Sequence, residues 1–345
     1  MLVVAVALGC AGCGGASQSG SQGSGLTAIG AGLKGPAGLR ASVYATGLPT
    51  VATLTFDARG RLWATAAGLT GHAGDGVYLI AAPDARPRRV ISGLNDPIGL
   101  LWYRGSLLVA SVGRVDAFSG LRDGHFAHRR TVLVGPVARA ENNNLVTTPD
   151  GRLLMGISAT CDHCRPASAY DGAIVSLRPD GSGLRLYAGR IRAPYGLALI
   201  PATGGLLVTM NQRDDLGAAT PGDWLAIVRA GQSWGFPGCY GQGGAVCAGV
   251  PKPLAVGDPH AAIGSVVVAT GQLGPGVGTS ALVTEWQSAK LLRVALTGSG
   301  SGVGASATEL VLGLRNPLGL VLAPDGSLLV GDWGTGTIYR IARAG

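Results

Sequence analysis

The sequence predicts an all-β fold, and three observations support this prediction. Glycine accounts for 59 of the 345 residues, which is typical of a chain with many tight turns between short strands. The apolar runs are short and end at Gly, Pro or Asp, and apolar residues at helical spacing are scarce. The third observation is an internal repeat, which predicts the number of strands as well as their type.

The repeat consists of a Gly-Leu or similar start, a short polar stretch, an apolar strand, a Gly turn and a second apolar strand. Its six copies begin at Gly47, Gly93, Glu141, Gly189, Ile263 and Gly313. The successive intervals are 46, 48, 48, 74 and 50 residues, which is the length of a four-stranded propeller blade with one insertion after the start of the fourth copy. We therefore expect a six-bladed β-propeller with four-stranded antiparallel blades over residues 36–345.

The sixth copy contains only three strand-like segments. The segment Arg40–Ala45, in LRASVYATGLP, is similar to the fourth-strand segments of other copies, such as LRLYAGRIRAP. An unpaired strand edge would leave backbone donors and acceptors open. We therefore expect this N-terminal strand to complete the sixth blade and close the ring.

Residues 1–35 are expected to precede the propeller as an export signal and a flexible linker. The apolar run MLVVAVALG is too short to cross a bilayer, but it resembles the end of a secretory signal. Cys10 and Cys13 follow it, and then a Ser/Gly/Gln-rich stretch, as in a bacterial lipoprotein. We predict export to the cell envelope or beyond, with lipidation at Cys10 or Cys13 as the only contact with a membrane.

Four other cysteines form two close pairs. In an exported chain we predict the disulfides Cys161–Cys164, in CDHC, and Cys239–Cys247. The alternative for CDHC is a metal or redox centre. Zinc needs four ligands, and the second pair lies far along the chain with a longer spacing, which favours the disulfides.

The net charge of +8 does not by itself predict binding of nucleic acid. The arginines are scattered between strands and aromatic residues are only 5%, whereas nucleic-acid-binding proteins cluster their charge. We expect a monomer that binds no nucleic acid and that tolerates anionic surroundings or ligands.

The polar loops are expected to gather at one end of the propeller axis. If the strands of a blade are called A to D from the axis outward, the D–A joints and the B–C loops share one face. The stretch RAENNNL, residues 139–145, is a D–A joint, and CDHC lies in a B–C loop. Functional loops on a rigid scaffold cluster in this way. The asparagines are therefore candidate ligands, although Asn is also common in strained turns.

The segment RIRAPYGLALIPATGGLLVTMNQRDDLGAATPGDWLAIVRAGQSWGFPGCYG resembles the core of the glucose/sorbosone dehydrogenase family, six-bladed propellers that use pyrroloquinoline quinone. The matching parts are Arg192, Gly196, Asn211–Asp215, Asp223 and Gly231–Pro237. NLVTTPDGRLLMGISATCDHC is likewise similar to a blade of that family with a Cys pair. The resemblance covers residues 40–345 and implies oxidation of a sugar or polyol, such as an aldose or sorbosone, with the bound quinone.

The resemblance also implies site residues. The quinone carries three carboxylates, for which Arg is well suited, and Arg192 matches the quinone-binding arginine of the family. The other expected cofactor-binding residues are Asn142, Asn143, Asn211, Gln212, Arg213 and Arg315. Calcium prefers six to eight oxygen ligands, and the expected ligands are Asp214, Asp215 and Asp223.

The sequence departs from the family pattern at two positions. Ala140 stands where the family has its catalytic His, and Ala193 stands where it has an Asn. The candidate general bases are therefore Glu141, which we expect to be solvated beside its amide neighbours, and His72. Two classes of function stay open: a quinone-dependent sugar dehydrogenase, or a non-catalytic lipid-anchored propeller that binds a sugar, a peptide or a protein.

Overall fold

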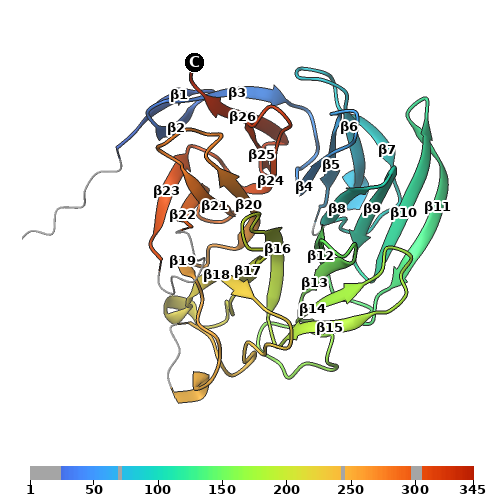
Figure 1. Cartoon of the computed structure of the whole chain (residues 1–345), viewed down its shortest axis with the longest axis vertical. Helices are drawn as coiled ribbons and strands as arrows, with labels where there is room; N and C mark the ends of the chain where they lie inside the picture. The colour runs from blue at the N-terminus through green and yellow to red at the C-terminus, as the bar shows by residue number, and fades with distance from the viewer. Residues whose placement is uncertain (1–24, 69–71, 242–244, 297–304) are drawn as a thin grey trace, which may run out of the picture.

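The computed structural model describes residues 25–68, 72–241, 245–296 and 305–345. Six β-sheets stand around a central axis, each with its first strand toward the axis and its last at the rim (Figure 1). Among the described residues, no helix has the length and apolar character needed to span a membrane. The predicted signal and its lipidation positions, Cys10 and Cys13, lie outside the described residues.

Blades one to four each consist of four consecutive antiparallel strands. Blade one contains β4 Thr53–Phe56, β5 Leu62–Ala66, β6 Gly76–Ile80 and β7 Arg88–Ile91. Blade two contains β8 Gly99–Tyr103, β9 Ser106–Ser111, β10 Arg114–Arg122 and β11 His125–Val134. Blade three contains β12 Asn142–Thr147, β13 Leu153–Ile157, β14 Ala173–Leu177 and β15 Arg185–Gly189. Blade four contains β16 Ala193–Leu199, β17 Leu206–Asn211, β18 Gly222–Val228 and β19 Ala255–Pro259.

The sixth blade closes the ring as the sequence predicts. Its strands are β24 Pro317–Leu322, β25 Leu328–Asp332, β26 Thr337–Arg343 and the N-terminal β3 Leu39–Ala45. β3 runs antiparallel to β26, with Ala41 opposite Ile341. The first and last segments of the propeller therefore hydrogen-bond within one sheet, and the predicted six-bladed all-β fold is confirmed (Figure 1).

The fifth blade is larger than predicted. Its strands are β20 Ile263–Thr270, β21 Thr279–Glu285, β22 Lys290–Ala295 and β23 Ala307–Leu312, followed by β2 Leu33–Pro36 and β1 Leu26–Gly30. The flexible linker expected up to residue 35 is therefore replaced by a β-hairpin from Leu26 onward. The reason is apolar burial, because Ile29 and Leu33 are buried in the core shared by blades five and six.

The blades pack face to face, which buries their central strands on both sides. Every residue of β5, β13 and β14 is buried. Between blades one and two, the rings of Trp63 and Trp102 stack with centroids 6.2 Å apart. Apolar burial of this kind contributes roughly 25 cal/mol per Å², so the sheets form a stable frame for the loops. Helical structure in the described ranges is limited to three single turns: η1 His72–Gly74, η2 Gly217–Ala219 and η3 Ala245–Cys247.

Candidate active site

A pocket of about 260 Å³ opens at one end of the propeller axis. All six blades contribute to its wall, for example through Ala52, Ile98, Glu141, Arg192, Trp286 and Trp333. Glu141 and Arg192 lie in D–A joints, whereas the two tryptophans follow the second strands of their blades. The predicted gathering of D–A joints and B–C loops at one face is therefore confirmed for these elements.

Glu141 is held at the pocket by blade three. Ser158 Oγ donates a hydrogen bond to Glu141 Oε2 at 3.2 Å, and the backbone N–H of Ser158 donates to the Glu141 carbonyl at 3.0 Å. Burial raises the pKa of the Glu141 carboxyl, and the negative charge of Asp96 raises it further, while Ser158 and the charge of Arg192 oppose the shift. The expectation of a solvated Glu141 is wrong, since the apolar wall removes water from this carboxylate.

Arg192 brings the positive charge to the pocket. Its guanidinium forms ion pairs with Asp162 and, at 3.4 Å, with Asp214. Its Nε also donates to the carbonyl oxygen of Asp162 at 3.2 Å. The side chain is 19% exposed, so an anionic ligand that enters the pocket can reach it.

Aromatic side chains form much of the remaining wall. Trp286 and Trp333 meet edge to face, with ring centroids 5.4 Å apart, and Trp333 Nε1 donates to the Ala67 carbonyl at 2.8 Å. Trp286 Nε1 is buried and has no hydrogen-bond partner among the described residues. Burial raises the pKa of Tyr195, and the charge of Glu141 adds to that effect. The wall therefore offers flat apolar faces to a ligand.

Of the asparagines predicted as ligands, Asn211 lines the pocket, whereas Asn142 and Asn143 are buried and do not line it. Asn211 lines the pocket and donates to the Ile263 carbonyl at 2.9 Å. Asn142 is buried and donates to the Ser111 carbonyl at 2.7 Å. Asn143 is buried and donates to Ser158 Oγ at 2.9 Å and to the Pro194 carbonyl at 2.8 Å. The Nδ2 groups of Asn142 and Asn143 thus join neighbouring blades, and neither residue lines the pocket.

Three other predicted cofactor-binding residues do not line the pocket. Gln212 is buried, and its amide lies 3.4 Å from the Met210 carbonyl. Arg213 binds Asp215 through two hydrogen bonds of 2.6 Å, and its guanidinium lies 4.8 Å from the ring centroid of Tyr240. Arg315 is exposed, and its backbone N–H donates to Asp332 Oδ2 at 2.7 Å.

The three aspartates predicted as calcium ligands do not form one site. Asp223 Oδ1 accepts the backbone N–H of Gln212 at 2.7 Å, within blade four, and Oδ2 accepts that of Ile263 at 2.9 Å, which ties blade four to blade five. Burial raises the pKa of Asp223 to about 7. Asp214 pairs with Arg192, and Asp215 pairs with Arg213. Within the described residues, hydrogen bonds and ion pairs therefore engage all three carboxylates.

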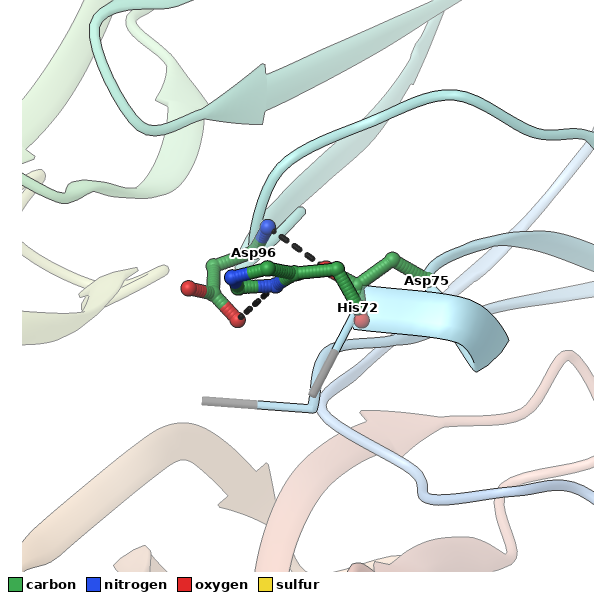
Figure 2. Close-up of side chains that lie close together, drawn as sticks. All are labelled: His72, Asp75 and Asp96. Carbon is green, nitrogen blue, oxygen red and sulfur yellow. Dashed lines mark hydrogen bonds and ion pairs between the residues drawn. The ribbon is translucent and has the colours of Figure 1, made fainter. Parts of the chain in front are cut away.

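His72 is not a pocket residue either. In Figure 2 its ring lies beside the carboxylates of Asp75 and Asp96, with Nδ1 2.9 Å from Asp75 Oδ2 and 3.6 Å from Asp96 Oδ1. The hydrogen bond to Asp75 raises the pKa of His72, and the charge of Asp96 adds to it. The group is therefore more fully protonated than an ordinary His. Asp75 in turn accepts the backbone N–H of Gly68 and of Asp96, so this cluster fastens a D–A joint.

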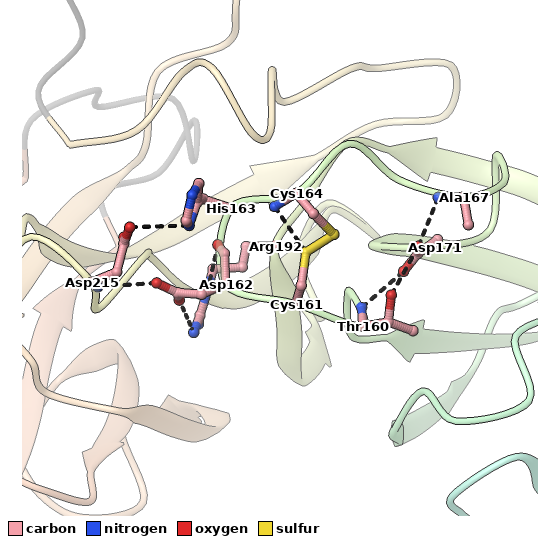
Figure 3. Close-up of a disulfide and its surroundings, with 9 residues drawn as sticks. All are labelled: Thr160, Cys161, Asp162, His163, Cys164, Ala167, Asp171, Arg192 and Asp215. Atoms are coloured by element: carbon pink, nitrogen blue, oxygen red, sulfur yellow. Dashed lines mark hydrogen bonds and ion pairs between the residues drawn. A yellow bond between two sulfur atoms is a disulfide. The ribbon is translucent and has the colours of Figure 1, made fainter.

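Both predicted disulfides are present. Cys161 is bonded to Cys164 and Cys239 to Cys247. Figure 3 shows the first pair beside Asp162, whose carboxylate reaches Arg192. Neither Asp162 nor Ser158 is identified as a site residue by the sequence. The sequence offers one indication for Asp162, which lies between two cysteines in a loop on the functional face. It offers none for Ser158.

The structure is similar to solved structures of a carbohydrate-active enzyme, a pyranose dehydrogenase domain and an aldose sugar dehydrogenase. The calcium structure of a Trichoderma reesei enzyme of carbohydrate-active family AA12 is 17% identical, with a TM-score of 0.75 over 90% of this chain and 96% of that one. The holo pyranose dehydrogenase PQQ domain of Coprinopsis cinerea is 17% identical, with a TM-score of 0.72 over 90% and 97%. The PQQ-bound aldose sugar dehydrogenase of Streptomyces coelicolor is 18% identical, with a TM-score of 0.67 over 89% and 99%.

No family model and no curated protein sequence matches the chain. The similarity therefore rests on three-dimensional structure, at identities where the fold is retained and residue roles have to be tested one by one. The chain therefore shares its fold with these proteins, over nearly the full length of each.

Proposed function

We propose that this protein is an exported dehydrogenase that oxidises a hydroxyl group of an aldose or polyol, with pyrroloquinoline quinone bound in the axial pocket. The observation that carries the proposal is that Glu141, a carboxylate whose pKa is raised, and the cation Arg192 line the same pocket. A hydroxyl oxidation needs a base near the substrate, and a carboxylated cofactor needs a cation.

The residues of the pocket fit a flat, anionic, aromatic cofactor. Arg192 offers a guanidinium for a carboxylate, and Trp286 and Trp333 offer faces for a planar ring system. These groups converge from blades four, five and six.

The bound quinone would supply a two-electron acceptor for the hydrogen on the substrate carbon. Glu141 removes the hydroxyl proton, and its raised pKa makes it a stronger base than an ordinary carboxylate. Ser158 fixes Oε2 of that carboxylate, and Asn143 fixes Ser158. Ala52, Ala67 and Ile98 give the pocket an apolar wall, which excludes water. Glu141 thus takes the place of the His expected at Ala140.

Calcium stays a prediction for this chain, and no step above uses it. A calcium ion is named for one of the similar structures. In this chain the expected ligands Asp214, Asp215 and Asp223 already bind arginines or backbone N–H groups. Export is part of the proposal, and two disulfides support it because such bonds persist in oxidising compartments.

The proposal is tested by titrating the purified protein with pyrroloquinoline quinone, with and without Ca²⁺, and by assaying a panel of aldoses and polyols with a dye acceptor. We expect Arg192→Ala to raise the Kd of the quinone at least tenfold. Arg185→Ala is the control, since Arg185 is an exposed arginine of β15 outside the pocket, and it should leave the Kd unchanged. Correctly folded protein that does not bind the quinone at micromolar concentration would contradict the proposal.

The alternative is a non-catalytic propeller that binds a sugar, a peptide or a protein. Two residues favour it: Ala140 is buried in the core, and Ala193 lines the pocket without a polar group. This function predicts sugar or partner binding that is independent of the quinone and of Glu141. Calorimetric titration of the same sugars in the absence of quinone separates the two functions.

A further inference from the structure

The disulfide Cys161–Cys164 closes a small ring whose two inner residues contact blade four (Figure 3). Asp162 accepts hydrogen bonds from the backbone N–H groups of Asp214 and Asp215, at 3.1 and 3.0 Å. His163 Nδ1 lies 3.0 Å from Asp215 Oδ2. The ring belongs to the β13–β14 loop, so these contacts fasten that loop of blade three to the β17–β18 loop of blade four.

The loop closed by this disulfide also holds Arg192. The Nη2 group forms an ion pair with Asp162 Oδ1, and Nε donates to the Asp162 carbonyl oxygen at 3.2 Å. Asp214 Oδ2 lies 3.4 Å from the same Nη2. These contacts occupy one edge of the guanidinium, that of Nε and Nη2. Within the described chain, Nη1 is the nitrogen left for a ligand. Asp162 therefore fixes how Arg192 is presented to the pocket.

The ring can open without releasing the rest of its loop. Cys164 is exposed and Cys161 is partly buried, so the disulfide lies near the protein surface. The base of the loop is held separately by Asp171, which accepts hydrogen bonds from the backbone N–H groups of Thr160 and Ala167, both at 2.9 Å (Figure 3). Opening the disulfide would thus free mainly the segment that carries Asp162.

We infer that Asp162 is a positioning residue for Arg192, kept in place by the Cys161–Cys164 disulfide, and that reduction of this disulfide weakens binding of a carboxylate ligand in the axial pocket. The identity of that ligand rests on the proposed function. The reductant is a dithiol: it supplies two electrons and two protons, the S–S bond is replaced by two thiols, and the dithiol becomes a disulfide.

Opening the disulfide changes how firmly Asp162 is held, and it does not change the net charge near Arg192. Neutral thiols replace a neutral disulfide, and Asp162 keeps its carboxylate. A flexible Asp162 must lose backbone freedom whenever it holds Arg192, and this entropic cost opposes ligand binding. Substitution of Asp162 itself is less simple, since it also removes a negative charge that opposes an anionic ligand. Breaking the disulfide is therefore a more specific test of the positioning role than replacing Asp162.

The first test compares two double variants, Cys161→Ser with Cys164→Ser and Cys239→Ser with Cys247→Ser. The probe is pyrroloquinoline quinone, titrated by quenching of tryptophan fluorescence. We expect the Kd to rise about tenfold in the first variant, or about 1.4 kcal/mol, and to stay unchanged in the second. Circular dichroism and thermal unfolding confirm that both remain folded. An unchanged Kd in the first variant would overturn the inference.

A double-mutant cycle shows whether the disulfide acts through Asp162. The cycle combines Asp162→Asn with the Cys161→Ser and Cys164→Ser pair. We expect the ring opening to have no further effect on the Kd once Asp162 is replaced. The same tenfold effect in the Asp162→Asn background would mean that the disulfide acts by another route.

A third measurement does not depend on quinone binding. The Nε–H resonance of Arg192, assigned through Arg192→Lys, is followed by NMR in the Cys239→Ser, Cys247→Ser background before and after addition of dithiothreitol. We expect slow hydrogen exchange in the oxidised protein and faster exchange after reduction, because the bond to Asp162 is lost. Unchanged exchange refutes the positioning role. If exchange changes but the oxidised protein binds no quinone, the proposed function fails and the positioning role stands.

Discussion

Ser158 Oγ donates a hydrogen bond to Glu141 Oε2, and the two residues are also joined through the backbone, from Ser158 N to Glu141 O. The pair links the end of β13 to the joint before β12, so a single side chain orients the only carboxylate that lines the pocket among the described residues. Because Ser158 donates to the ionised form, it also lowers the pKa that burial raises.

Ser158→Ala should therefore raise the pKa of Glu141 further. A base must be deprotonated to act, so activity rises as the pH passes through this pKa from below. We expect the acidic limb of the kcat/KM profile to move to higher pH, and kcat to fall roughly tenfold as the orientation is lost. Ser182→Ala, in a turn between β14 and β15, is the control and should leave the profile unchanged. A profile identical to wild type would show that Ser158 does not tune Glu141.

Glu141→Gln and His72→Gln distinguish the two candidate bases. We expect Glu141→Gln to lower kcat at least about a hundredfold while the Kd of the quinone stays within a few-fold of wild type. His72 is held by Asp75 and Asp96 outside the pocket, so His72→Gln should change kcat less than twofold. The measurement is steady-state oxidation of the best sugar with a dye acceptor. Loss of activity in His72→Gln alone would reverse the assignment.

Asp223→Asn tests whether this residue is structural. Asp223 accepts two backbone N–H groups, and Asn provides only one acceptor oxygen, so we expect a loss of about 1–3 kcal/mol in the free energy of unfolding. Chemical denaturation measures this loss. Calcium titration of the folded variant should match wild type. Loss of calcium binding with unchanged stability would instead restore Asp223 as a metal ligand.

The buried Asp223 also predicts how stability depends on pH. Its pKa is raised from 3.8 to about 7 in the folded protein, so the folded state holds this proton more tightly than the unfolded state. The contribution of this group to stability is therefore fully present below pH 3.8 and is lost as the pH rises to about 7. Comparing the free energies of unfolding of Asp223→Asn and wild type between pH 5 and 8 isolates the contribution of Asp223. We expect the stability difference between the two proteins to shrink as the pH increases.

Truncation separates the roles of the N-terminal strands. A variant that begins at Gly25 keeps β1, β2 and β3, and we expect it to unfold like the full chain. A variant that begins at Gly38 lacks only β1 and β2, whereas a variant that begins at Gly47 also lacks β3 and leaves β26 with an open edge. It should fail to fold or should aggregate, as judged by circular dichroism and size-exclusion chromatography. Two-state unfolding of this shorter variant at wild-type stability would show that ring closure by β3 is dispensable.

The sequence by itself determined the number of blades, the closure of the ring and the two disulfides. These follow from local spacing: the repeat interval sets the blade, the sixth copy lacks one strand, and paired cysteines lie close along the chain. The sequence also placed Glu141 and Arg192 on the same face, because strand order alone decides which loops share an end of the axis.

Only the tertiary structure decided which polar residues face the pocket and which join the frame. Asn143 and Pro194 are 51 residues apart, and Asp223 and Ile263 are 40 apart, yet each pair is hydrogen-bonded. The burial that raises the pKa of Glu141 likewise comes from walls that several blades supply. Hydrogen bonds and desolvation depend on neighbours that the folded ring brings together, so a local motif can place a residue on a face without deciding what it does there.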